Sequence, residues 1–217
     1  MAVAKPSGVA SAHFQGGQET LDRAVKSYLK QKYNKPGQVF LGIVHRLDRP
    51  VSGVMLFAKT SKAAARLSEQ FRAGSVEKIY WAVVESRLDA PCRDLACWLR
   101  KDRQRGCVEV VEPNTPGAQA ASLSYRVCRQ TDSLSWLEIR PQTGRTHQVR
   151  VQLAHAGHPI YGDAKYGSFQ RFGRAIALHA RSLRFAHPVR REPIELLAEL
   201  PSLWTKCFEG LFPTVRR

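Results

Sequence analysis

The sequence predicts an α+β fold with a mixed, mostly antiparallel central sheet flanked by helices and loops. Segments with strand-like patterns clearly outnumber segments with helical spacing, so the strict strand–helix–strand repetition of a parallel α/β fold is absent. The chain has 217 residues, of which 43% are hydrophobic and 24% charged, which is typical of a globular protein with a real core. This length suits one large domain or two small ones.

The first half of the chain begins with a short strand that runs into a turn at Ser7 and Gly8. Apolar residues at helical spacing then predict a helix that begins at Leu21, with Thr20 as its N-cap, and ends before Pro36. The remaining elements expected here are apolar core strands at 40–44 and 54–58, a helix over 61–72 whose apolar face is Ala64, Leu67 and Phe71, and a buried strand at 79–84.

Residues 86–118 are less regular and rich in charge, and we expect an insertion or a hairpin there. The elements expected after it are strands at 122–128 and 134–140, a helix over 147–155 with Thr146 as its cap, strands at 183–185 and 194–197, and a terminal helix over 201–208.

The charge of the chain indicates a polyanionic partner. The formal net charge is +16 and the isoelectric point is near 10.2, with the excess cations spread along the chain. A broad basic surface of this kind most simply serves a nucleic acid. No apolar run approaches the roughly 20 residues of a membrane span. The five cysteines form no C-x-x-C pair, so we expect reduced thiols in the cytoplasm and no cysteine zinc site.

The segment from His45 to Pro50 carries the strongest chemical signal. It places the carboxylate of Asp48 among Arg46, Arg49 and His45, on a connection between two expected core strands. Neighbouring cations favour the ionised carboxylate. Asp48 is therefore a candidate nucleophile or base held on a rigid frame, although an arginine-paired turn aspartate has the same local sequence.

A second motif, over residues 140–150, is polar and basic and leads into a helix. A helix N-terminus with adjacent arginines suits a phosphate, while Arg145 could instead be the partner of a buried carboxylate. The glycine-rich segment 157–167 lacks the spacing of a P-loop, and the histidines form no H-E-x-x-H pattern. We therefore expect neither a nucleotide cofactor nor a metal.

These motifs together resemble those of the RluA family of RNA pseudouridine synthases, over nearly the whole length of the chain. The matching segments, in order, are Lys5–Gly8, the motif around Asp48, Lys78–Ala82, Thr143–Arg150, Gly157–Gly167 and Leu178–Ala180.

The resemblance implies a pseudouridine-synthase fold and the isomerisation of uridine to pseudouridine in rRNA or tRNA. By this resemblance Asp48 is the catalytic aspartate, Tyr80 stacks on the target base and is implicated in proton abstraction, and Arg145 pairs with the aspartate. The further substrate-binding candidates are Arg46, which helps to extrude the base, Val149 against the pocket, Lys5 in support of the tyrosine, and His45, Arg49, Thr146 and His147 beside the RNA.

The reaction is a net rearrangement without redox change, so no cofactor is expected. Asp48 could attack C1′ or take a proton from C2′, and the sequence does not choose between these routes. We expect a monomeric, single catalytic domain over residues 1–217, without the S4-like domain that precedes it in many relatives. One rival is a catalytically silent RNA-binding protein. The other is a glycosidase or nuclease, which would usually need a second carboxylate or a metal cluster.

Overall fold

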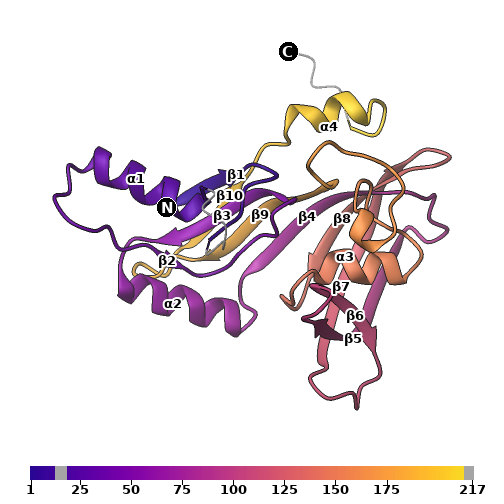
Figure 1. The fold of residues 1–217 in the computed structure, drawn as a ribbon, viewed down its shortest axis with the longest axis horizontal. Coiled ribbons are helices and arrows are strands. Elements are labelled where there is room, and N and C mark those ends of the chain that lie inside the picture. The colour runs from indigo at the N-terminus through magenta and orange to yellow at the C-terminus, as the bar shows by residue number, and fades with distance from the viewer. Residues whose placement is uncertain (13–18, 213–217) are drawn as a thin grey trace. The chain divides into compact units, whose positions relative to one another are not determined.

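The computed structural model describes residues 1–12 and 19–212 (Figure 1). The chain divides into two compact units, each built from separated stretches of sequence. The first unit contains Met1–Lys78 and Ala180–Glu199, and the second contains Ile79–His179 and Leu200–Arg217. The expectation of one catalytic domain over residues 1–217 stays a prediction.

In the first unit, strand β3 lies between β1 and β9, and β10 pairs with β9. The short strand β2 also pairs with β3, and the pairings of β3 with β1 and with β2 are antiparallel. The elements of this unit are β1 (Ala2–Lys5), α1 (Leu21–Lys32), β2 (Gly42–Ile43), β3 (Ser52–Ala58), α2 (Ser61–Arg72), the start of β4 (Glu77–Val84), most of β9 (Leu178–Ala186) and β10 (Pro193–Leu197).

Strand β3 is buried along all seven of its residues because helices cover both of its faces. Side chains alternate along a strand, so Met55 and Phe57 pack with α1. Leu56 and its neighbours on the other face pack with Leu67 of α2. The position of Gly53 also requires glycine: its φ is +129°, and a Cβ there would lie 2.3 Å from the Ala180 carbonyl oxygen.

In the second unit the strands follow the order β4, β8, β7, β5, β6, and every pairing among β5 to β8 is antiparallel. Helix α3 packs on this sheet through Val151, which joins the buried side chains of Leu99, Val108 and Ala121. The remaining elements are β5 (Cys92–Asp102), β6 (Cys107–Val111), β7 (Gln119–Gln130), β8 (Ser135–Pro141), α3 (Gln148–His155), a 3-10 turn η1 (Ala164–Tyr166) and α4 (Ser202–Cys207).

The predicted α+β class with a mostly antiparallel sheet is confirmed, and helix α2 has the predicted bounds. Other elements differ from the prediction. The apolar run at 40–44 contributes only the two-residue strand β2. The 86–118 segment holds the antiparallel hairpin of β5 and β6, which is one of the two alternatives expected there. Thr20 occupies the N-cap position of α1, but its hydroxyl bonds to the Asp22 carboxylate and makes no capping bond.

Candidate active site

Asp48 lies on the connection between β2 and β3, residues 44–51, which we call the Asp48 connection. Hydrogen bonds on both sides of Asp48 fix this connection. Before it, the Ser11 hydroxyl donates to the Leu47 carbonyl at 2.6 Å and accepts from the Leu47 N–H at 3.1 Å. After it, the Gly8 N–H donates to the Arg49 carbonyl at 2.8 Å, and the Arg49 Nε donates to the Gly8 carbonyl at 2.9 Å. Leu47 is buried and Asp48 is half-buried. The backbone around Asp48 is therefore clamped to the segment that follows β1.

Lys5 lies beneath this connection, with only 1% of its surface exposed. Its ammonium donates to the carbonyls of Pro6 at 2.9 Å, Val9 at 2.7 Å and Arg49 at 3.2 Å. Burial lowers the pKa of Lys5 to about 8, and the Asp48 carboxylate opposes that shift. All three ammonium hydrogens are used within the protein. Lys5 therefore acts on the site through the connection that it holds.

His45 ties the start of the same connection to β3. Its Nε2 accepts the Leu56 N–H at 2.8 Å, and its ring stacks on Phe71 with centroids 4.8 Å apart. Burial, and secondarily the charge of Lys78, lower the pKa of His45 to about 4. His45 is therefore neutral at neutral pH, and the acceptor role of Nε2 assigns the ring hydrogen to Nδ1.

Arg46 and Arg49 lie on either side of buried Leu47 and half-buried Asp48, and both are exposed. Arg49 is partly committed to the Gly8 carbonyl, whereas Arg46 stands two residues before Asp48 with its side chain in solvent. The first unit therefore brings together Asp48, two exposed cations, the buried Lys5 and the half-buried His45.

The remaining catalytic candidates lie in the second unit and are described within it. Tyr80 is half-buried on β4, directly opposite Ile139 of β8. Arg145 is exposed; its N–H donates to Gln148 Oε1 at 2.9 Å and its Nε to the Ala120 carbonyl at 3.1 Å. Val149 is 7% exposed, on the first turn of α3.

The start of α3 differs from the prediction, because His147 and not Thr146 occupies the N-cap position. His147 has a left-handed backbone with φ of 51°. The Gln148 side chain organises the preceding turn: its Oε1 accepts from the Thr143 hydroxyl at 2.7 Å as well as from Arg145. Thr146 is exposed on this turn, so the predicted cap at Thr146 is wrong.

Residues from the glycine-rich segment hold the start of α3, a role that the sequence did not indicate. The Tyr166 hydroxyl accepts from Val108 N–H at 3.0 Å and lies 2.7 Å from His147 Nδ1. Asp163 forms a buried bidentate pair with Arg150 at 2.7 and 2.8 Å. The signal available in the sequence was Asp163, because a carboxylate that becomes buried needs a cation beside it.

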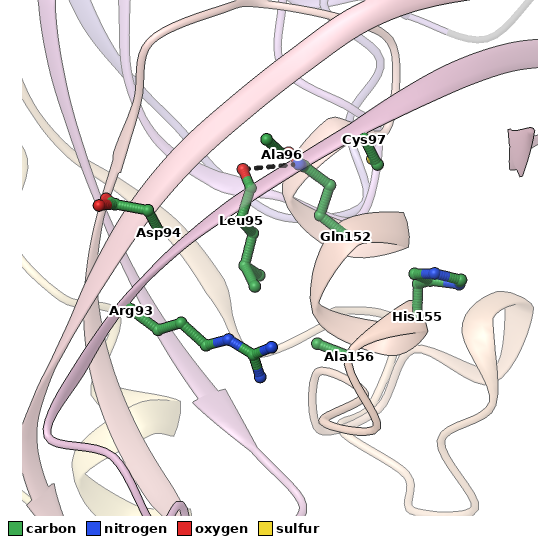
Figure 2. A pocket seen from close by; sticks show the side chains of 8 residues that line it. All are labelled: Arg93, Asp94, Leu95, Ala96, Cys97, Gln152, His155 and Ala156. Atoms are coloured by element: carbon green, nitrogen blue, oxygen red, sulfur yellow. Dashed lines mark hydrogen bonds between the residues drawn. The ribbon is translucent and has the colours of Figure 1, made fainter. Parts of the chain in front are cut away.

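Two of the hollows on the second unit adjoin α3 or the turn before it. The smaller, of about 300 Å³, joins Thr146 and His147 to Lys101 and Arg103 of the β5–β6 hairpin. The larger, of about 450 Å³, lies between β5 and α3 (Figure 2). There the Gln152 amide donates to the Leu95 carbonyl at 3.1 Å, as the dashed line in Figure 2 marks, and Arg93 and His155 line the rim. The smaller hollow gives a basic surface next to the second sequence motif.

Among residues 1–12 and 19–212, no group of three His, Cys, Asp or Glu side chains is arranged to hold a metal ion. The same residues contain no helix long and apolar enough to cross a membrane. All five cysteines are free thiols.

The fold corresponds to a known class of RNA-modifying proteins. The family model described as RNA pseudouridylate synthase matches residues 1–155, and the chain belongs to this family. The resemblance found in the sequence motifs is thereby confirmed.

Individual relatives support this assignment to the family. Ribosomal large subunit pseudouridine synthase C of Vibrio cholerae is 33% identical over 203 residues, covering 90% of this chain and 61% of the relative. tRNA pseudouridine synthase C of Pectobacterium carotovorum is 34% identical, covering 94% of this chain and 57% of the relative. The chain thus spans less than two thirds of the length of these curated relatives. The solved structure of human RNA pseudouridylate synthase domain containing 4 is 26% identical, with a TM-score of 0.80 over 97% of this chain and 88% of that one.

Proposed function

We propose that this protein isomerises specific uridines of rRNA or tRNA to pseudouridine, with Asp48 as the reacting carboxylate. The observation that carries the proposal is the double clamp around Asp48 within a chain of the pseudouridylate synthase family. Relatives named for ribosomal and for transfer RNA both match, so the proposal extends to either substrate class.

The chemistry suits a positioned carboxylate without a cofactor. The reaction breaks the N1–C1′ bond, rotates the uracil and forms a C5–C1′ bond. C5 loses its proton to a base, and N1 takes up one proton. Asp48 either attacks C1′ or removes a proton from C2′, and both routes need its carboxylate form. Because the product is an isomer of the substrate, atoms and electrons balance without an oxidant or reductant.

The target base must leave its stack before C1′ is accessible, which costs a few kcal/mol. Arg46 is exposed and close in sequence to Asp48, so it serves to stabilise the extruded state by filling the space that the uridine leaves. Tyr80 supplies a stacking surface for the detached uracil, and buried Val149 an apolar wall that excludes water.

Electrostatics supports binding of a folded RNA. Thr146 and His147 of the second basic motif line the smaller hollow, and Lys101 and Arg103 of the hairpin add two cations there. In this proposal the 86–118 segment contacts RNA through phosphate groups, which fix register without reading the base sequence. The protein acts as a cytoplasmic monomer with one catalytic domain.

Release of tritium from RNA that contains C5-labelled uridine tests the proposal directly. The wild-type chain should release tritium from rRNA or tRNA transcripts, while Asp48→Asn, which keeps the shape and removes the charge, should release none and bind RNA within several-fold of wild type. Asp132→Asn alters an exposed turn aspartate and is the matched control. Tight RNA binding by the wild-type chain without any tritium release would instead indicate a catalytically silent RNA-binding protein.

A further inference from the structure

The C-terminal end of α1 carries a cluster of exposed lysines and tyrosines that the proposed chemistry does not use. We call it the lysine–tyrosine cluster, and its members are Tyr28, Lys30, Lys32, Tyr33, Lys35 and Lys59. The Lys35 N–H donates to the Lys30 carbonyl at 3.0 Å, so the turn after the helix folds back beside its last turn. Lys59 joins from the connection after β3.

The Tyr28 hydroxyl and the Tyr33 ring each contact one of the ammonium groups. The Lys32 Nζ lies 5.3 Å from the centroid of the Tyr28 ring and donates to its hydroxyl at 2.9 Å. The Lys59 Nζ lies 5.4 Å from the centroid of the Tyr33 ring. The rings are 46% and 50% exposed, so neither is needed to fill the core. The cations are thus partly ordered before any ligand arrives, which lowers the entropy lost on binding.

Stability of the helix does not account for four cations at this place. The macrodipole at a helix C-terminus is equivalent to about half an elementary charge, which one or two lysines offset. In the described ranges, 1–12 and 19–212, no carboxylate forms an ion pair with any of the four lysines. Their mutual repulsion therefore opposes folding slightly, and a bound polyanion would relieve it.

We propose that the lysine–tyrosine cluster binds the phosphate backbone of the substrate RNA, as a contact separate from the Asp48 connection. The identity of the polyanion as substrate RNA rests on the proposed function. Lysine ammonium groups are compact charges on flexible stems, so they bind successive phosphates without reading the base sequence. The exposed edges of Tyr28 and Tyr33 offer an apolar contact for a ribose or an unstacked base beside them.

Replacing the four lysines together tests this surface. The variant Lys30→Gln, Lys32→Gln, Lys35→Gln, Lys59→Gln should bind substrate RNA at least about tenfold more weakly near physiological salt, and the slope of log affinity against log salt should fall by up to about 3. Its single-turnover rate at saturating RNA should stay at the wild-type value, because these residues lie outside the reacting groups.

A control variant removes the same total charge elsewhere: Lys62→Gln, Arg72→Gln, Arg184→Gln, Lys206→Gln, all at exposed positions. It should lose less than about threefold in affinity if phosphate contacts, and not net charge, decide binding. Equal losses in the two variants would overturn the proposal, since binding would then follow overall charge. An unchanged affinity in the cluster variant would overturn it as well.

Replacing the two tyrosines provides an independent test of the proposal. Tyr28→Ala with Tyr33→Ala keeps every charge, so affinity should fall while the salt slope stays at the wild-type value. An unchanged affinity would show that the rings neither order the lysines nor contact RNA. Failure of the proposed function is distinguishable from these outcomes: it appears as wild-type protein that releases no tritium, whatever its RNA affinity.

Discussion

The Leu56 N–H donates a 2.8 Å hydrogen bond to Nε2 of His45, so a backbone group in the middle of β3 is satisfied by a side chain from the Asp48 connection. Only the neutral imidazole can accept this bond. The buried ring and the core strand are thus joined by an interaction that depends on the protonation state of one histidine.

Acid should destabilise the first unit through this bond. The folded pKa of His45, about 4, is below its ordinary value of 6.5, so folding favours the neutral ring. The contribution is complete above pH 6.5 and is lost as pH falls through 4, by as much as about 3 kcal/mol. Urea unfolding across this range measures it. His45→Gln should flatten this part of the pH profile, while His155→Gln at an exposed position should not; identical profiles for all three proteins would contradict the assignment.

Loss of the buried ammonium should loosen the Asp48 connection. Lys5→Met keeps the length of the side chain but leaves three carbonyls without their donor, so unfolding should become easier by about 1–3 kcal/mol. The tritium-release rate should fall more than RNA affinity, since Lys5 touches the connection and not solvent. Lys62→Met, on the exposed side of α2, is the control and should change neither quantity.

The Arg150–Asp163 pair should be the most costly ion pair to break. Both side chains are nearly buried, at 6% and 1% exposure, so Arg150→Leu leaves a buried carboxylate without its cation. We expect a loss of about 3–5 kcal/mol in unfolding free energy. Arg190→Leu breaks the exposed pair with Glu192 and should cost less than about 1 kcal/mol. Comparable losses of unfolding free energy in the two variants would show that solvent compensates the charge of Asp163 when Arg150 is absent.

Arg46 should affect chemistry more than affinity. If it stabilises the extruded uridine, Arg46→Ala should slow single-turnover isomerisation more than it weakens equilibrium RNA binding. A substrate with the target uridine mismatched should recover part of the rate, because extrusion then costs less. Arg72→Ala on α2 is a matched exposed control. Equal losses in rate and affinity, without recovery on the mismatched substrate, would reduce Arg46 to an ordinary phosphate contact.

The sequence predicted local elements well where one periodicity dominates. The stripe of Ala64, Leu67 and Phe71 defines α2, and the fully apolar run of β3 follows from burial on both faces. A hairpin was one of the alternatives expected at 86–118, but the bounds of strand β5 were not predicted, because apolar Ala96 and Trp98 lie on its exposed side and obscure the alternation.

The position of Asp48 between two strands also followed from the sequence, but its supports did not. Ser11 meets Leu47 across 36 residues, and a serine hydroxyl leaves no periodic signal. The left-handed backbone at His147 was equally hidden, because it depends on the bond with Tyr166 nineteen residues later. Long-range polar contacts of this kind need the tertiary structure.

The position of Lys5 in the sheet has a consequence for the order in which the first unit folds. Lys5 is the last residue of β1, and its register opposite Gly53 is fixed only when β1 has paired with β3. The carbonyls of Val9 and Arg49 therefore meet their donor only after that strand is in place. Asp48 thus acquires these surroundings only after β1 has joined the sheet. Amide exchange at Gly8 and along β1 should accordingly share one opening free energy.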